Sequence, residues 1–385
     1  MKKTMCFLIS LTLALAVGAA SCTEENKNSA LEGWEKLGRE ETPDDGNGDS
    51  STTPPDDGDN GNGEETKWFL TRGVICGWED VQDPETLDYI DIAKNHGLNS
   101  FSIYGAPRSS STWKNFMADC DEAGIAIEFQ EHMMYFLLPR SLFSTHPEYF
   151  RMNSQGVRVD DANGCPSSEE ALRIVKGKAA QLGESYKPTN HKYYFWMDDG
   201  GDICYCPNCR QLSASDQALI FENATIEGLK EIDPEAKLAH LSYAGTTDAP
   251  KSVTPHEDIF LEFAPFWRSW KAPLVDTWTS GANGMTHAKY LRALHDNLEV
   301  FPSETAQVLE YWMDDSMWSG WDKTNLQRVP WSLDIFKKDI DTYAGYGIRH
   351  MTCYTAYVGP AYVEKFGFPD FLVEYADYLS NYKKK

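Results

Sequence analysis

The sequence is poor in basic residues, with 35 Lys and Arg against 59 Asp and Glu, and its net charge is −24. A chain this acidic repels phosphate backbones, so nucleic acid is excluded as an expected partner. The apolar run at residues 7–17 is too short to span a bilayer comfortably. The nine histidines include no pair at metal-ligand spacing, which disfavours a metal-dependent hydrolase. Hydrophobic residues nevertheless make up 41% of the chain, enough for a folded core.

The N-terminus has the pattern of a signal peptide over residues 1–21. Lys2 and Lys3 precede the apolar run, and small residues come after it. The Ala-Ala-Ser sequence directly before Cys22 resembles a bacterial lipobox, in which the cysteine is lipidated. We therefore expect lipidation at Cys22, the alternative being a soluble secreted chain with an ordinary cysteine.

Residues 22–66 contain 14 Asp and Glu but 3 Lys and Arg, with repeated Asp/Gly runs. Such a segment cannot form a core and is typical of an extended, disordered tether. A calcium loop is disfavoured because the spaced ligands and closing Glu of such a loop are missing. Glu24 and Glu25 resemble the signal that sends some lipoproteins to the outer cell surface. We expect a lipid-anchored outer-membrane protein, with the membrane a partner only through its anchor.

From residue 67 to 385 no second linker interrupts the chain, and apolar runs alternate with helical patterns. This alternation predicts a single-domain α/β fold, a (β/α)8 TIM barrel with its active site at the carboxyl ends of the strands. The eight predicted strands are Arg72–Cys76, Asn99–Tyr104, Ile125–Gln130, Tyr193–Met197, Lys237–Tyr243, Ile259–Phe263, Gln307–Trp312 and Arg349–Tyr354.

The tetrapeptide Trp-Met-Asp-Asp occurs twice, ending at Asp199 after the fourth strand and at Asp315 after the seventh. Carboxylates from opposite sides of a barrel are what glycoside hydrolysis requires, one acting as acid and the other as nucleophile or base. We expect Asp199 to be the general acid, Glu310 the nucleophile or base, and Asp198 a further catalytic candidate. The simpler alternative is that these residues cap helices or lie in solvated loops.

Polar and aromatic residues at other strand ends are candidates for substrate contact. Carboxylates, His and Tyr can hydrogen-bond to sugar hydroxyls, and Trp rings can stack on sugar faces. Seven of the twelve tryptophans fall between residues 267 and 331, although core packing is the more usual role for any one of them. The candidates are Glu128, His132, Tyr243, Glu262, Trp312, Trp318, Trp321 and Tyr354.

Three cysteines lie within six residues, at Cys204, Cys206 and Cys209, and Cys165 lies upstream. Four thiolates can form a closed tetrahedral zinc site, which would be structural because it leaves no place for water. Disulfides are the alternative in an exported protein. No organic cofactor is expected.

The motifs together resemble an exported bacterial family catalogued as a domain of unknown function, number 4838, which is grouped with TIM-barrel glycoside hydrolases. The matching segments, in order, are His146-Pro147-Glu148-Tyr149-Phe150, Gly156-Val157-Arg158, Cys165, Asp199 with the three clustered cysteines, Leu241-Ser242-Tyr243-Ala244, Phe263-Ala264-Pro265 and Glu310-Tyr311. The resemblance implies a glycosidase-like barrel.

The cysteine pattern is also similar to the zinc site of family 42 β-galactosidases, which have Asn-Glu where this chain has Asp198-Asp199. Family 20 hexosaminidases have Asp-Glu there. The shorter side chain at Asp199 departs from both families and from the mechanisms that they imply. We predict a surface lipoprotein glycoside hydrolase that cleaves oligosaccharides, the alternative being a glycan-binding lipoprotein without catalysis.

Overall fold

The computed structural model describes residues 67–384. The predicted signal peptide, the acidic tether and Cys22 lie outside these residues, so those expectations stay predictions. No helix within residues 67–384 is both long and apolar enough to cross a bilayer.

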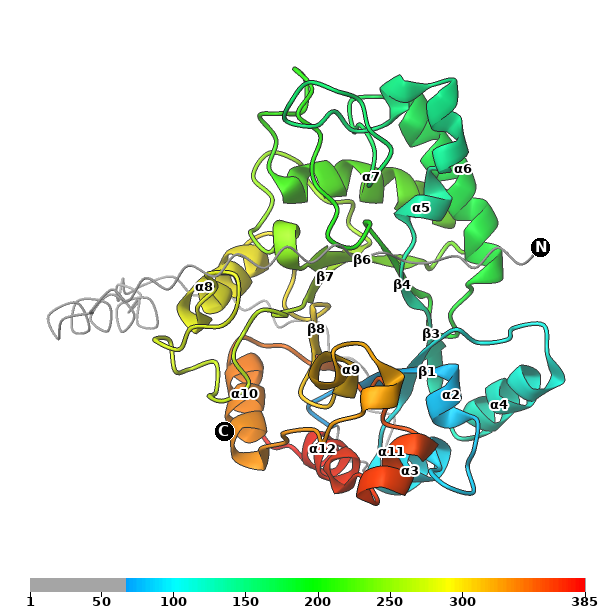
Figure 1. Cartoon of the computed structure of the whole chain (residues 1–385), viewed down its shortest axis with the longest axis vertical. Coiled ribbons are helices and arrows are strands. Elements are labelled where there is room, and N and C mark those ends of the chain that lie inside the picture. The colour runs from blue at the N-terminus through cyan, green and yellow to red at the C-terminus, as the bar shows by residue number, and fades with distance from the viewer. Residues whose placement is uncertain (1–66, 385) are drawn as a thin grey trace, which may run out of the picture. The chain divides into compact units, whose positions relative to one another are not determined.

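The strands form one parallel sheet that closes into a barrel, which confirms the predicted fold (Figure 1). The strand order is β3-β2-β1-β9-β8-β7-β6-β5-β4. Phe129 joins β3 to β4, so that these two short strands together occupy one of eight positions around the barrel. The strands are β1 (Thr71–Gly77), β2 (Ser100–Tyr104), β3 (Ala126–Glu128), β4 (Gln130–His132), β5 (Lys192–Trp196), β6 (Lys237–Ser242), β7 (Ile259–Phe263), β8 (Gln307–Glu310) and β9 (His350–Tyr354).

Each predicted strand is present with ends within two residues of those expected, but the third is divided at Phe129. At this break the Gln130 N–H donates to the Ser102 hydroxyl (2.9 Å). The chain can therefore leave β2 and begin pairing with β5 without an unsatisfied amide at that point.

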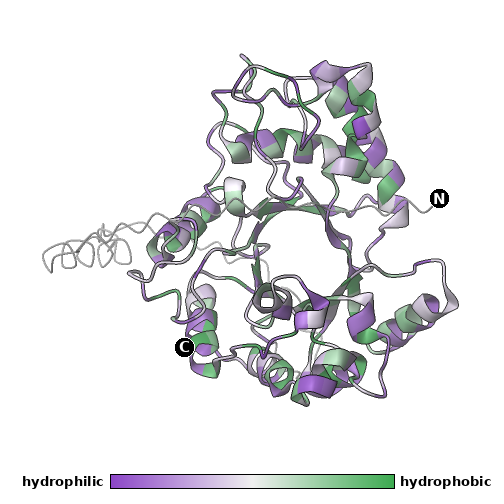
Figure 2. Ribbon diagram, viewed as in Figure 1, coloured by the Kyte–Doolittle hydropathy of each residue, from purple (hydrophilic) through white to green (hydrophobic). Residues whose placement is uncertain are grey.

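Helices surround the barrel, and Figure 2 shows hydrophobic residues along the strands with mixed polar and apolar helices outside them. The longer helices are α3 (Tyr89–His96), α4 (Ser111–Glu122), α6 (Glu169–Ser185), α7 (Ala214–Leu229), α8 (His287–Leu298), α10 (Leu333–Gly345), α11 (Pro360–Phe366) and α12 (Asp370–Ser380). Three short helices come after strand ends: α2 (Trp78–Val81), α5 (Met134–Leu137) and α9 (Asp315–Ser319). No α-helix separates β6 from β7, and their connection holds a 3-10 turn, η3 (Ala244–Thr246).

The Asp83-Pro84-Glu85 segment has the sequence pattern of a helix start, but helix α3 begins after Asp88. Asp88, rather than Asp83, caps α3 by accepting the N–H of Asp91 (2.9 Å). Asp83 instead accepts a hydrogen bond from Thr86 in a turn (2.8 Å). The helix ends at Gly97, whose φ of 88° is the left-handed conformation that glycine adopts readily at a helix end.

The barrel interior is polar below its mouth. Tyr194 donates to Gln307 (3.1 Å), and Gln307 donates to Glu262 (3.0 Å). Above this layer, apolar side chains such as Ile75, Leu241 and Leu309 form a buried cluster. Both faces of each strand are thus buried, one against this interior and the other against the helices.

Candidate active site at the barrel mouth

Aromatic side chains cover the carboxyl end of the barrel. Tyr311 and Tyr354 stack with ring centroids 5.2 Å apart, and both belong to or pack on the apolar cluster inside the barrel. Tyr104 and Tyr243 are partly buried against the same cluster from other strands. These four tyrosines are called here the tyrosine floor. Tyr311 is buried, and the three partly exposed members can contact sugar rings and donate to their hydroxyls.

Asp199 lies beside this floor, just past the end of β5. The Tyr243 hydroxyl donates to its Oδ1 (3.3 Å), and His132 Nε2 lies 3.9 Å from the same oxygen. His132 Nδ1 hydrogen-bonds to the Met197 carbonyl, so Nδ1 carries a proton and Nε2 is the nitrogen that faces Asp199. The structure thus places Asp199, Tyr243 and His132 together, and 65% of the Asp199 side chain is exposed.

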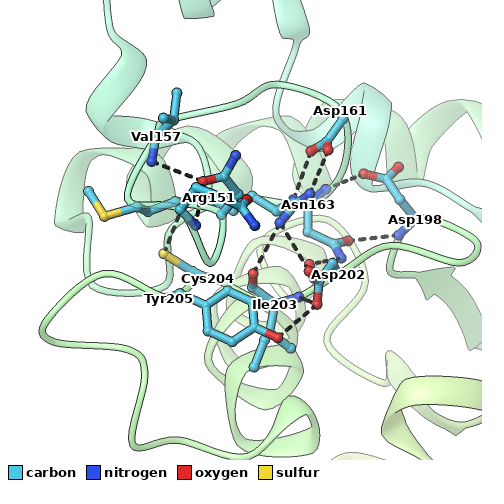
Figure 3. A network of polar contacts seen from close by, with 12 residues as sticks. Arg151, Val157, Asp161, Asn163, Asp198, Asp202, Ile203, Cys204 and Tyr205 are labelled. Carbon is cyan, nitrogen blue, oxygen red and sulfur yellow. Dashed lines mark hydrogen bonds and ion pairs between the residues drawn. The ribbon is translucent and has the colours of Figure 1, made fainter.

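Asp198 has a different environment although it is adjacent in sequence. Its carboxylate pairs with Arg140 and accepts the Asn163 main-chain N–H (2.5 Å). The Asn163 side chain in turn accepts the Asp198 N–H (2.9 Å), as Figure 3 shows. These contacts fasten the loop after β5 to the long segment between β4 and α6. Asp198 therefore positions the loop, and its predicted catalytic role is not supported by these contacts.

A cavity of about 460 Å³ opens beside Asp198. Its walls come from the loop after β5, from α7 and from η3, and include His132, Tyr243, Glu222 and Cys204. The cavity thus extends from the group around Asp199 to the cysteine-bearing loop. A sugar unit of a bound glycan would find both polar and apolar walls there.

Two further carboxyls lie on the other side of the mouth. Asp80 comes after β1 and Asp314 after β8, and both are 4% exposed. Burial raises the pKa of each carboxyl to about 7. Hydrogen bonds from nearby N–H and hydroxyl groups act in the opposite direction, but their effect on the pKa is smaller. Both carboxyls also raise the pKa of Tyr104, after the larger effect of burial. A carboxyl that is partly protonated at neutral pH can donate a proton.

The prediction that Glu310 faces Asp199 is wrong. Glu310 is fully buried and accepts hydrogen bonds from Arg268 (2.7 Å) and from Tyr343 on α10 (2.5 Å). Its neighbours Leu309 and Tyr311 belong to the interior cluster, so Glu310 projects outward toward the helices. Arg268 also pairs with Asp339 of α10 (2.7 Å), which makes Glu310 part of a structural ion network.

Three predicted substrate contacts are also wrong or inaccessible. Trp312 shares the outward face of Glu310, packs on Phe336 and donates to Asp339 (3.1 Å). Glu128 and Glu262 are fully buried. Glu262 lies under the tyrosine floor, where burial raises its pKa to about 8 despite the hydrogen bonds that it accepts.

The remaining predicted aromatics lie around the mouth. Tyr354 forms part of the floor. Trp318 is partly buried against Trp270 (5.8 Å between ring centroids), and both indole N–H groups are buried without a partner within residues 67–384. Trp321 is 63% exposed after α9. Sequence reasoning missed Tyr135 and Phe136 of α5, which are 55% and 48% exposed; the signal was a pair of aromatics within four residues of a strand end.

The four predicted cysteines form one buried cluster without a disulfide. Their ligand atoms all lie within 4.8 Å of one another, and Cys165 Sγ is 3.6 to 3.9 Å from the other three sulfurs. A tetrahedral site with Zn–S bonds of 2.3 Å separates its sulfurs by about 3.8 Å, so the residues fit a metal. The Met152 N–H also donates to Cys204 Sγ (3.3 Å), the kind of contact that supports a thiolate ligand.

No curated protein matches the chain. Among solved structures, a GH42 β-galactosidase has a TM-score of 0.44 at 12% identity over 81% of this chain and 57% of its own. An α-galactosidase from Thermus thermophilus scores 0.42 at 13% identity, over 82% of this chain and 65% of its own. An endo-β-1,4-mannanase from Thermotoga petrophila has a TM-score of 0.41 at 11% identity, over 83% of this chain and 78% of its own. With scores and identities this low, the activities in those names do not transfer to this chain.

A protein-family model also matches more than half of the chain. The model of the family described as Domain of unknown function (DUF4838) matches residues 76–311, from the end of β1 to the residue after β8. The matched part includes Asp80, Asp199, the mouth residues His132 and Tyr243, and the cysteine cluster. The chain belongs to the DUF4838 family.

Proposed function

We propose that the protein is a glycoside hydrolase that binds an oligosaccharide at the barrel mouth and that Asp199 is one of its two reacting carboxyls. The observation that carries this proposal is the grouping of Asp199, Tyr243 and His132 at the open end of a barrel, beside a cavity and above a floor of tyrosines. The arrangement offers a carboxylate, hydroxyl donors and an aromatic surface within one site.

Asp314 replaces Glu310 as the second carboxyl in this proposal. It comes after β8, on the far side of the mouth from β5, and one of its oxygens accepts the Ser316 hydroxyl (2.6 Å) and N–H (3.0 Å). Its raised pKa of about 7 suits a group that protonates the leaving oxygen. Asp199 then attacks the anomeric carbon or activates water.

The second candidate function is glycan binding without catalysis. Its support is the solvation of Asp199, because a carboxyl that is 65% exposed lacks the dry surroundings that usually tune a catalytic acid or nucleophile. The aromatic floor and the cavity would serve this function equally well.

Screening the purified protein against 4-nitrophenyl glycosides and against plant and host glycans tests the proposal. Turnover of at least one substrate is expected, and Asp199→Asn or Asp314→Asn should lower kcat/KM by about 10²- to 10⁴-fold. Asp121→Asn, at an exposed carboxylate in the last turn of the outer helix α4, is the matched control. The wild-type kcat/KM should decline above about pH 7 as Asp314 loses its proton. Binding without turnover on every substrate would establish the second candidate instead.

We also propose that the cysteine cluster holds a structural zinc ion. Zinc would fasten the loop after β5, since Cys204 lies five residues beyond Asp199. Elemental analysis should find one zinc ion per chain, lost in Cys206→Ser and retained in Cys353→Ser, whose thiol lies outside the cluster. Metal-free protein with a disulfide between any two of the four would contradict this assignment.

The proposed location is the outer membrane, with lipid on Cys22. Cys22→Ser should release the protein from the membrane fraction. Release of the unaltered chain would contradict the proposal.

A further inference from the structure

A second cavity, of about 290 Å³, opens on the same end of the barrel but among different loops. Its walls come from the segments after β1, β8 and β9, and they include Asp80, Lys323, Leu326, Tyr357 and Gly359. The cavity beside Asp198 is built instead from the loops after β5 and β6. The two cavities therefore lie on different sides of the tyrosine floor.

Asp80 is the buried polar group of this second cavity. One oxygen, Oδ2, accepts the main-chain N–H groups of Gly77 (2.8 Å) and Tyr357 (3.3 Å). Asp80 forms no ion pair within residues 67–384, although it is only 4% exposed to solvent. A buried carboxyl without a cation is costly unless further hydrogen bonds satisfy it.

Gly359 packs closely against Asp80. A Cβ atom at residue 359 would lie 2.9 Å from Asp80 Oδ1 and 2.6 Å from its Cα. Any larger residue would therefore press on the Asp80 side chain and fill the space beside Oδ1. The absence of a side chain at 359 lets this loop pack against Asp80, and both residues line the cavity.

The segment that contributes Lys323 to the cavity wall also carries an exposed indole, that of Trp321. Trp321 has a φ of 60° and Tyr357 a φ of 67°, a left-handed conformation that bulky residues rarely adopt. The Tyr357 hydroxyl donates to the Trp321 carbonyl (3.4 Å), so these two unusual residues support one another. The backbone thus holds the Trp321 ring in solvent, where it gains no packing energy from the core.

The chemistry of the walls selects among occupants. An anion would meet Asp80 together with Glu79 and Asp83, which also line the cavity. A metal ion would meet Lys323, whose ammonium pairs with Glu79 across the site. A neutral polyhydroxylated ring meets neither obstacle: a carboxyl accepts its hydroxyls, Gln82 and Lys323 donate to it, and an indole stacks on its apolar face.

We propose that this cavity is a sugar-binding subsite, with Asp80 as its buried hydrogen-bonding group and Trp321 as its stacking platform. The proposal rests on the function proposed above and extends it, because a glycan that reaches both cavities must contain several sugar units. The substrate is then an oligosaccharide bound across the tyrosine floor, rather than a single terminal sugar.

Binding of defined ladders to the Asp199→Asn variant tests the subsite without interference from turnover. The probes are cello-, manno- and chito-oligosaccharides of one to six units, measured by isothermal titration calorimetry. Affinity should rise with chain length for at least one ladder. Adding Trp321→Ala or Asp80→Asn should weaken the longest member about tenfold and leave the shortest bound member unchanged. Trp278→Ala removes an indole that is 44% exposed on another loop and should change nothing.

Parallel assays of hydrolysis separate this proposal from the function on which it rests. Binding that depends on glycan length and on Trp321, without hydrolysis by the wild-type protein, would contradict the proposed hydrolase activity and support the subsite. Hydrolysis that Trp321→Ala and Asp80→Asn leave unaltered at every glycan length would contradict the subsite and support the hydrolase activity. Failure of every ladder to bind would overturn the subsite.

Discussion

The two Trp-Met-Asp-Asp segments are identical in sequence and opposite in environment. Trp196 points into the barrel and donates to Glu262 (2.9 Å), whereas Trp312 points outward and donates to Asp339 (3.1 Å). In the first segment, the last aspartate reaches the open mouth. In the second, Asp315 is fully buried and accepts the Gln327 N–H (3.0 Å).

The difference originates in how far each segment lies from its strand. Trp196 is the last residue of β5, but Trp312 lies two residues beyond the end of β8. The next element also differs, since Asp314 caps the short helix α9 and Asp199 enters a loop. Identical residues therefore acquire different chemistry from strand register and from the element that comes after them.

The largest predicted effect concerns the outward side of the second segment. Arg268→Ala should lower the free energy of unfolding by about 3–5 kcal/mol, because it leaves the buried carboxyls of Glu310 and Asp339 without their cation. Urea denaturation measures the change. Arg210→Ala, at an exposed arginine, is the control. A loss below about 1 kcal/mol would contradict this prediction, because it is the cost expected of a solvated ion pair and not of a buried one.

Glu262, which accepts the hydrogen bond of Trp196 inside the barrel, predicts that the stability of the protein depends on pH. The Glu262 pKa is raised to about 8 from an ordinary value of 4.5 chiefly by burial, so the folded state binds the extra proton. This contribution to stability is present below about pH 4.5 and is lost as the pH rises through 8. Glu262→Gln should reduce the fall in unfolding free energy between pH 5 and pH 8.5 by on the order of 3 kcal/mol. Glu85→Gln, at an exposed carboxyl, should leave that fall unchanged.

Asp80 and Asp314 add to the same trend in the wild-type protein, because burial raises both of their pKa values to about 7. The substitution at Glu262 therefore removes one part of the pH dependence and not the whole. Equal slopes in Glu262→Gln and wild type would mean that water reaches this carboxyl.

Exchanging each tryptophan for phenylalanine compares the two segments directly. Trp196→Phe and Trp312→Phe should each cost about 1–3 kcal/mol of stability, since each leaves a buried carboxyl one donor short. Only the first should also weaken glycan binding, because Trp196 supports the mouth and forms a ring contact with His132 (5.2 Å). Calorimetric titration with the oligosaccharide ladders measures this. Equal loss of binding in both variants would contradict the inward and outward assignment.

The sequence predicted the barrel and the position of Asp199 but not the position of Glu310, and the reason is physical. Alternating apolar and polar residues reveal a strand's buried face only where the other face meets water. Here the interior holds Glu262 and Gln307 while the helix side holds Glu310, so both faces carry buried polar groups. The register of β8 against its neighbouring strands decides whether Glu310 points inward or outward, and this register cannot be derived from a single sequence.

The cysteine cluster could be predicted because it depends on local spacing rather than on strand register. Its three downstream members lie within six residues, so local spacing alone brings them together. Asp80 and the second cavity were not found, because Gly359 approaches Asp80 from a loop 279 positions away. Contacts that short-range patterns encode can be predicted from sequence, whereas those that depend on barrel closure cannot.

The smallest predicted effect separates folding from chemistry in the first segment. Asp199→Asn should change the free energy of unfolding by less than about 0.5 kcal/mol, because the side chain is 65% exposed and contacts one hydroxyl and one imidazole. The same substitution at Asp315 alters a fully buried carboxyl that holds the Gln327 N–H, and should shift stability more. Urea titrations of both variants at pH 7 measure the contrast. If Asp199→Asn were the more damaging of the two, this carboxylate would be holding the loop after β5 in place, and any loss of turnover in that variant would be a loss of structure.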